Sequence, residues 1–145
     1  MTSEQSSRPM VLLVDDNATI RDLAARILAL EGYQVLTAEN GEEALALAST
    51  LDGQLGLVVT DIRMPVMDGL ELATHLARLK PTLPVVFISG FANSLAVPGP
   101  VLAKPFGADT LLAAVAQFLP VITDGQLDEP DVALAPGGQR RPLEG

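Results

Sequence analysis

The chain has 145 residues and no cysteine, which excludes disulfide bonds and thiolate metal sites. Its net charge of −9, with no basic cluster, argues against binding to nucleic acid. No apolar run approaches the ~18 residues of a membrane span, and residues 1–10 contain no signal-peptide core, so we expect a soluble cytoplasmic protein without membrane contacts.

Apolar runs and helical periodicity alternate along the chain. Taken in order, they predict strand 10–14, helix 20–31, strand 33–37, helix 41–50, strand 56–60, helix 70–79, strand 84–88, strand 101–103 and helix 108–119. Asn40 with Glu43 and Asp68 with Glu71 are two capping-box pairs, each an N-cap residue followed three positions later by a glutamate. These pairs predict the starts of the second and third helices.

The alternation predicts a doubly wound α/β domain over residues 9–119, with a parallel sheet and helices on both faces. The connection between the last two strands is an exception. Residues 91–100 contain two prolines and a glycine, which leave room for one or two helical turns, so we expect a shortened fourth helix. Residues 1–8 and the acidic, Pro- and Gly-rich residues 120–145 have no period and are predicted to be disordered.

Polar side chains stand where the predicted strands end, in the order Asp15, Asp16, Asp61, Ser89 and Lys104. All carboxyl ends of a parallel sheet lie at one edge, where ligands of open α/β sheets bind, so these side chains should converge. Three carboxylates placed together repel one another by about 4 kcal/mol per pair at 4 Å and an effective dielectric of 20. A hard divalent cation relieves this repulsion, and Mg²⁺ is the one that we expect.

A carboxylate in such a pocket is equipped to attack phosphorus. Asp61 would supply the attacking oxygen, while the metal and Lys104 would neutralise charge on the phosphoryl oxygens and Ser89 would donate a hydrogen bond. Each residue also has a plainer reading. Asp61 alone is more often a turn or cap residue, and Asp15 and Asp16 could simply cap the first helix.

Four segments together resemble the receiver domain of bacterial two-component response regulators. They are residues 14–17 (VDDN), 60–69 (TDIRMPVMDG), 88–90 (ISG) and 104–106 (KPF), and the resemblance extends over residues 9–119. No single segment is specific, whereas all four in this order on these strands are. The resemblance implies a flavodoxin-like five-stranded sheet of order 2-1-3-4-5.

The resemblance also implies a role for each matching acid. Asp61 matches the residue that accepts a phosphoryl group from a histidine kinase or a phosphotransfer protein. Asp16 matches a direct Mg²⁺ ligand, and Asp15 matches a residue that orients a metal-bound water. Arg63 matches a position that lends its backbone carbonyl to the metal. The implied cofactor is therefore Mg²⁺.

The remaining matches concern the response to phosphorylation. Lys104 matches the amine that pairs with the phosphoryl oxygens, and the resemblance implies a cis bond between Lys104 and Pro105. Ser89 matches the hydroxyl that bonds the phosphoryl group, and the small Gly90 would leave room for it.

The chain departs from the family pattern at two places. Val101 stands where receivers usually carry an aromatic residue that moves with the hydroxyl. Only 14 residues separate Ser89 from Lys104, fewer than in most receivers. The usual output face is therefore altered. We expect the switch and partner contacts at Ser89, Gly90, Phe91, Val101 and Pro105, with Phe91 replacing the missing aromatic.

The sequence favours a signalling switch that catalyses only its own phosphorylation and dephosphorylation. Residues 120–145 are too few for a DNA-binding domain, so output to an unidentified downstream protein is expected. The alternatives are a phosphorylation-independent interaction module and a receiver excised from a hybrid sensor kinase. An aspartyl phosphatase is disfavoured because the first strand ends in adjacent acids rather than D-x-D, and nucleotide or flavin binding because no Gly-rich phosphate loop follows a strand. The sequence indicates no particular kinase and no oligomeric state.

Overall fold

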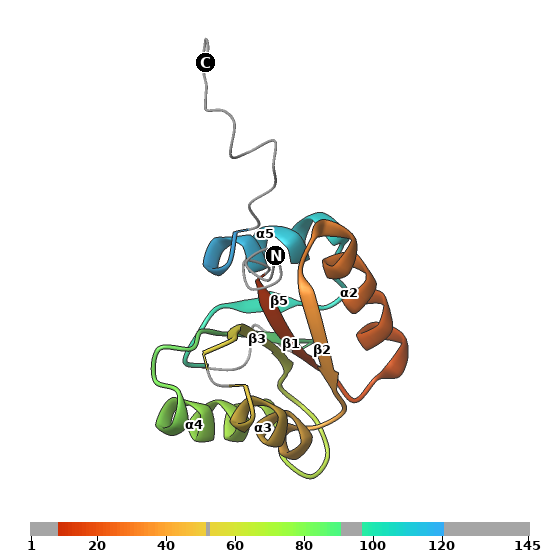
Figure 1. The fold of residues 1–145 in the computed structure, drawn as a ribbon. Helices are drawn as coiled ribbons and strands as arrows, with labels where there is room; N and C mark the ends of the chain where they lie inside the picture. The colour runs from red at the N-terminus through yellow and green to blue at the C-terminus, as the bar shows by residue number, and fades with distance from the viewer. Residues whose placement is uncertain (1–8, 52, 91–96, 121–145) are drawn as a thin grey trace, which may run out of the picture.

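A computed structural model describes residues 9–51, 53–90 and 97–120. Its five strands form one parallel sheet of order β2-β1-β3-β4-β5 (Figure 1). The strands are β1 (Met10–Val14), β2 (Gln34–Ala38), β3 (Leu55–Asp61), β4 (Val85–Ser89) and β5 (Val101–Ala103). The predicted fold class and strand order are confirmed, and every strand begins and ends within one residue of its predicted range.

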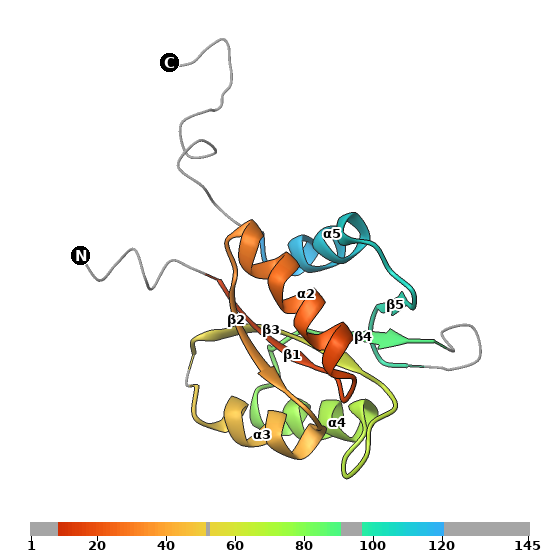
Figure 2. The same ribbon diagram turned by 90° about the vertical axis from the view of Figure 1, so that its right-hand side faces the viewer.

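Four helices in the described residues cover the two faces of this sheet (Figures 1 and 2). They are α2 (Ala18–Glu31), α3 (Gly41–Ser49), α4 (Gly69–Leu79) and α5 (Ala108–Phe118). Helices α2 and α5 pack together on one face, and α3 and α4 pack together on the other. Because all the strand pairs are parallel, the turns that follow the carboxyl ends of the strands lie at the same edge of the sheet.

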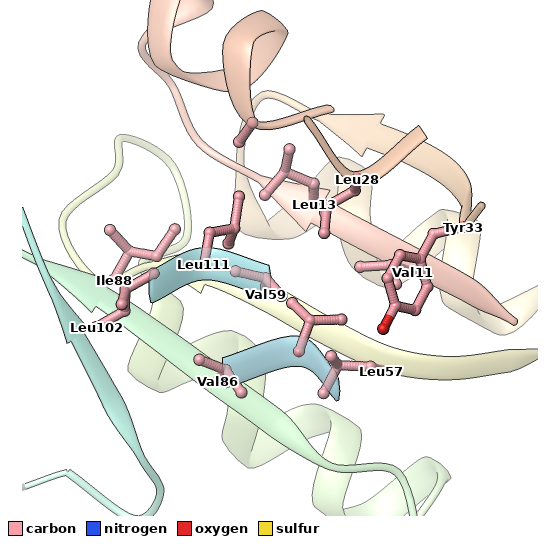
Figure 3. Packing of buried hydrophobic residues seen from close by; sticks show 12 residues of the cluster. Val11, Leu13, Leu28, Tyr33, Leu57, Val59, Val86, Ile88, Leu102 and Leu111 are labelled. Carbon is pink, nitrogen blue, oxygen red and sulfur yellow. The ribbon is translucent and has the colours of Figure 1, made fainter. Parts of the chain in front are cut away.

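The core consists of two apolar layers, one on each side of the sheet. Side chains alternate between the faces of a strand, and all five residues of β1 are buried. Val11 and Leu13 pack toward α2 and α5 (Figure 3), while Leu12 and Val14 pack toward α3 and α4. A strand buried on both faces reads as a continuous apolar run, which is why residues 10–14 were recognisable in the sequence.

Side-chain caps fix the helix starts near the carboxyl edge. Asn17, Asn40 and Asp68 each accept a hydrogen bond from the backbone N–H three residues later, at 2.8–3.1 Å. In the predicted second-helix pair, the Glu43 carboxylate reaches past the N-cap and accepts from the backbone N–H of Glu39, one residue before Asn40, at 2.7 Å. Asn17 also explains why α2 begins two residues earlier than the apolar pattern predicted.

Tyr33 stands just before the edge strand β2 and connects it to the last helix, α5. Its side chain is buried, and its hydroxyl donates a hydrogen bond of 2.6 Å to the backbone carbonyl of Leu119, just after α5. The Leu119 side chain in turn lies against Gly56, near the start of β3. The end of α5 is thus fixed at the amino ends of the strands.

The β4–β5 side of the sheet is the smaller side. Strand β5 has three residues. The residue just before β5, Pro100, accepts a hydrogen bond at its backbone carbonyl from the backbone N–H of Phe87 in β4. A groove of about 620 Å³ runs beside β4 between α4 and the end of α5, lined by residues that include Ala77, Arg78, Leu83, Val85 and Phe118. The described residues 97–100 are not helical.

Three predictions lie outside the described residues. The shortened fourth helix falls mainly on residues 91–96, and the disordered termini were predicted for residues 1–8 and for the tail that includes 121–145. The described helices include none that is long and apolar enough to cross a membrane.

Candidate functional site

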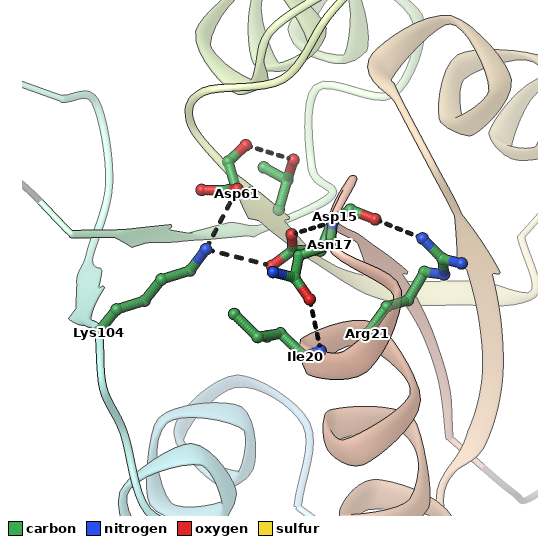
Figure 4. Close-up of polar contacts among 7 residues, drawn as sticks. Asp15, Asn17, Ile20, Arg21, Asp61 and Lys104 are labelled. Carbon is green, nitrogen blue, oxygen red and sulfur yellow. Dashed lines mark hydrogen bonds and ion pairs between the residues drawn. The ribbon is translucent and has the colours of Figure 1, made fainter.

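The central strand β3 carries Asp61 to the carboxyl edge. Asp61 is the last residue of β3, pairs with Ile88 of β4, and is 6% exposed. The next residue, Ile62, donates its backbone N–H to the Ile88 carbonyl at 3.0 Å. The Asp61 carboxylate is therefore held at the end of a strand that is flanked on both sides (Figure 4).

The end of β1 supplies two more acids. Asp15 is fully buried, and its backbone N–H donates to Ala38 of β2 at 3.1 Å. One of its carboxylate oxygens, Oδ1, accepts from the backbone N–H of Asn17 at 2.9 Å. Asp16 is exposed, yet carboxylate oxygens of Asp15, Asp16 and Asp61 all lie within 4.8 Å of one another.

Lys104 places an amine between two of these acids (Figure 4). Its Nζ lies 3.3 Å from Asp61 Oδ2 and 3.5 Å from Asp15 Oδ2. The Lys104 backbone N–H donates to the Ser89 carbonyl at 3.0 Å, which attaches the end of β5 to the end of β4. The bond between Lys104 and Pro105 is cis, as the resemblance implied.

The electrostatics of the site show a shortage of positive charge. Burial, and then the neighbouring Asp15 carboxylate, raise the pKa of Asp61 to about 6, although the Lys104 ammonium acts in the opposite direction. The buried Oδ2 of Asp15 has no hydrogen-bond partner among the described residues, and its ion pair with Lys104 is 3.5 Å long. One ammonium does not offset three carboxylates.

This donor set fits a hard divalent cation. Such ions bind carboxylate and carbonyl oxygens. The buried Oδ2 of Asp15, which has no hydrogen bond among the described residues, could bind the ion directly or accept a hydrogen bond from a water on it. Asp15, Asp16 and Asp61 are the residues that would hold the ion.

Ser89 lies where the sequence led us to expect it. It ends β4, is 2% exposed, and follows Ile88, the strand partner of Asp61. Gly90 is exposed, and a Cβ added there would meet no atom within 4 Å. Arg63, two residues after Asp61, is also exposed. The structure thus groups these positions near Asp61, while their functional roles stay predictions.

Of the other residues expected to contact partners, the structure describes two, Val101 and Pro105. Val101 is half-buried at the start of the edge strand β5, and Pro105 is exposed just after it. Phe91 lies outside the described residues.

The loop from Asp61 to α4 is tightly constrained. The Gly69 backbone N–H donates to the Ile62 carbonyl at 2.8 Å, and a Cβ at Gly69 would collide with the Asp61 backbone carbonyl. Val66, 72% exposed, has a φ of 72°, which is strained for a β-branched residue. The loop's path under Asp61 therefore requires a glycine at 69.

Sequence reasoning missed one residue that contacts the site. The guanidinium of Arg21 donates a hydrogen bond of 2.8 Å to the backbone carbonyl of Asp15 (Figure 4). A signal was present, because Cβ atoms in a helix point toward its amino end. A long side chain on the first turn of α2 can thus reach back to the preceding loop.

Fold and site together define a class, the doubly wound α/β domains with clustered acids and a lysine at the carboxyl edge. The family model of the response regulator receiver domain matches residues 11–116. The response regulator receiver protein CpdR of Brucella abortus (strain 2308) is 34% identical over 116 residues, which cover 75% of this chain and 95% of CpdR. The chain belongs to the response regulator receiver family.

Other relatives are much longer proteins. The sensor kinase CckA of Brucella abortus is 35% identical over 124 residues, which make up 81% of this chain but 13% of CckA. The chain likewise matches 24% of the transcriptional regulatory protein DctD of Rhizobium meliloti, at 37% identity. Similarity to these two proteins is therefore confined to a small part of each.

Solved structures agree with the fold. The crystal structure of the receiver domain from the hybrid histidine kinase CckA superposes with a TM-score of 0.68 at 38% identity, covering 76% of this chain and 98% of that domain. The chemotaxis protein CheY4 of Vibrio cholerae gives a TM-score of 0.67 at 30% identity, covering 77% and 99%.

Proposed function

We propose that this protein accepts a phosphoryl group on Asp61 from a histidine kinase or a phosphotransfer protein, and that it uses Mg²⁺. One observation carries the proposal. The Lys104 amine lies 3.3 Å from the Asp61 carboxylate at the edge where the acids of β1 also converge. The similarity to receivers of sensor kinases such as CckA supports a phosphohistidine donor.

The chemistry is a displacement at phosphorus. A carboxylate oxygen of Asp61 forms a bond to phosphorus while the bond from phosphorus to the donor imidazole nitrogen breaks, and that nitrogen keeps the electron pair. Lys104 neutralises charge on the phosphoryl oxygens. Mg²⁺, when bound by Asp15, Asp16, Asp61 and the Arg63 carbonyl, supplies further positive charge at these oxygens.

Ser89 is proposed to respond to the phosphoryl group on Asp61. Its hydroxyl, at the end of the strand next to Asp61, would donate a hydrogen bond to a phosphoryl oxygen, and Gly90 would leave the β4 end free to adjust. Such a contact biases a two-state equilibrium, by about 1–3 kcal/mol in typical couplings, and a downstream protein reads the result. The protein then acts as a switch, with no substrate beyond its own phosphoryl group.

The direct test is phosphorylation by acetyl phosphate in the presence of Mg²⁺, followed by mass spectrometry. We expect one phosphoryl group on the wild type and none on Asp61→Asn. Lys104→Met should slow the reaction strongly, because the phosphoryl oxygens would lose their ammonium partner. Absence of an adduct on the wild type, with this donor and with phosphoramidate, would refute the proposal.

A phosphorylation-independent interaction module is the second candidate. It is favoured by the reduced β4–β5 side, where β5 has three residues and Val101 replaces an aromatic residue. For this candidate, a binding partner would show equal affinity for the wild type and for Asp61→Asn, with and without acetyl phosphate. A difference between the two proteins that appears only with the donor selects the switch.

A further inference from the structure

Among the three acids of the site, Asp16 is the one whose carboxylate makes no hydrogen bond or ion pair with the described residues. Asp15 is buried and accepts from Asn17, and Asp61 contacts Lys104. Asp16 is exposed, and its side chain has no hydrogen bond or ion pair within the described part of the chain. The direction of its carboxylate therefore depends on the backbone that leads into it.

That backbone is held by Arg21. The carbonyl of Asp15, which accepts the Arg21 hydrogen bond at 2.8 Å, belongs to the peptide group that joins Asp15 to Asp16. Rotation of this peptide group would turn the Cα–Cβ bond of Asp16. Arg21 is itself fixed in the first turn of α2, because its backbone N–H donates to Asn17 at 2.9 Å.

We propose that Arg21 is a positioning residue for the metal site: by holding the Asp15–Asp16 peptide group, it directs the Asp16 carboxylate toward Asp15 and Asp61. The proposal rests on the function proposed above, since it concerns the same Mg²⁺ site. The guanidinium has an opposite effect through its charge, which repels a divalent cation. The two effects predict opposite changes in Mg²⁺ affinity when Arg21 is replaced.

The experiment compares Arg21→Met, Arg21→Lys and the control Arg26→Met. Methionine keeps an unbranched apolar side chain but loses the donor and the charge, whereas lysine keeps both in a different geometry. Arg26 is an exposed residue of the same helix and has no contact with the site among the described residues. Mg²⁺ affinity is measured by isothermal titration calorimetry, and the rate of phosphorylation by acetyl phosphate is measured as a function of Mg²⁺ concentration.

We expect Arg21→Met to weaken Mg²⁺ binding about tenfold, as is typical when a group that orients a metal ligand is lost. Arg21→Lys should restore part of the affinity, and Arg26→Met should equal the wild type. The phosphorylation rate of Arg21→Met should recover at saturating Mg²⁺, because Asp61 and Lys104 remain in place. Since Mg²⁺ could also rescue a destabilised variant by binding its folded state, metal-free thermal unfolding of Arg21→Met is measured alongside, and we expect it to match that of Arg26→Met.

Unchanged or tighter Mg²⁺ binding by Arg21→Met would overturn the proposal, as would an equal loss in Arg26→Met. If Arg21→Met fails to fold, Arg21→Lys decides, and wild-type affinity in that variant would also count against a role for the guanidinium geometry. Failure of the proposed function is distinct, because then the wild type itself would bind no Mg²⁺ and take up no phosphoryl group.

Discussion

The two sides of the sheet are built differently. On the β1–β3 side, β1 is buried throughout, β3 has seven residues, and the backbone of Asp15 donates to β2 and accepts from Arg21 of α2. On the β4–β5 side, β5 has three residues and a groove of about 620 Å³ lies beside β4. The acids lie on the β1–β3 side, and Ser89 and Lys104 lie on the smaller β4–β5 side.

This difference suggests how the two sides divide the work. A site that binds a metal and attacks phosphorus needs carboxylates held in place, and strands flanked on both sides provide this. Under the proposed function, the side that responds to phosphorylation should be the less stable one, and a three-residue edge strand is consistent with this. Lys104 connects the two, because its amine contacts Asp15 and Asp61 while its backbone follows β5 on the smaller side.

The largest expected difference between the two sides concerns core truncation. Leu57→Ala, in β3, should lower the free energy of unfolding by about 3–4 kcal/mol, because the cavity is enclosed on all sides. Leu102→Ala, in β5, should lower it by about 2 kcal/mol, because a three-residue edge strand can relax into the space. Urea unfolding measures both, and equal losses would contradict the proposed contrast in rigidity.

A smaller contrast is expected at two glycines near the site. Gly69→Ala should cost about 2–3 kcal/mol, because the added Cβ meets the Asp61 backbone carbonyl and the loop must move. Gly90→Ala, on the β4 side, meets open space and is the matched control, with almost no expected cost. Gly69→Ala should also slow phosphorylation of Asp61 by acetyl phosphate, and a wild-type rate would show that the loop does not position this residue.

Asp61, on the β1–β3 side, should make the stability of the metal-free protein depend on pH. The folded-state pKa of Asp61 is about 6, above its ordinary value of 3.8, so its protonated form is favoured by folding. This stabilisation is complete below about pH 3.8 and is lost as the pH rises through about 6.

Without metal at neutral pH, Asp61→Asn should therefore be more stable than the wild type, by about 1–2 kcal/mol after allowance for solvent screening. The advantage should shrink as the pH falls from about 6 toward 4, and saturating Mg²⁺ should reduce it by stabilising the wild type. Thermal unfolding at several pH values measures the effect. Parallel pH profiles for the two proteins would contradict it.

The smallest effect is expected in the loop after Asp61. Val66→Asn should raise the free energy of unfolding by about 0.5–1 kcal/mol, because asparagine tolerates the positive φ of 72° better than a β-branched residue. Val66→Ala keeps a Cβ at the same φ and should gain less. Chemical denaturation with both variants measures the difference, and a loss of stability in Val66→Asn would show that the valine side chain has packing partners.

Much of the fold could be predicted from local sequence, because each element carries its own periodicity. Residues 10–14 read as a buried strand, and Asp68 marked the start of α4. The grouping of Asp61 with Lys104 followed from the rule that parallel strands end at one edge. The strand order, by contrast, came from the family resemblance, because local patterns do not state which strands are neighbours.

Other features depend on three-dimensional packing and were out of reach. The φ of Val66 depends on how the loop passes under Asp61, and the raised pKa of Asp61 depends on its burial beside Asp15. The direction of the Arg21 side chain was accessible in principle from its place in the first helical turn, but not its acceptor. Sequence patterns locate elements and their ends, whereas contacts between side chains and backbone require coordinates.

The bond from Tyr33 to Leu119 has a consequence for how signals can leave the domain. It anchors the last helix at the amino ends of the strands, whereas Asp61 stands at the opposite end of the seven-residue β3, about 20 Å away at the usual rise per residue. The end of α5 is therefore remote from the proposed phosphorylation site at Asp61. Communication between the two must pass through the sheet or α5, or through a partner that spans both ends.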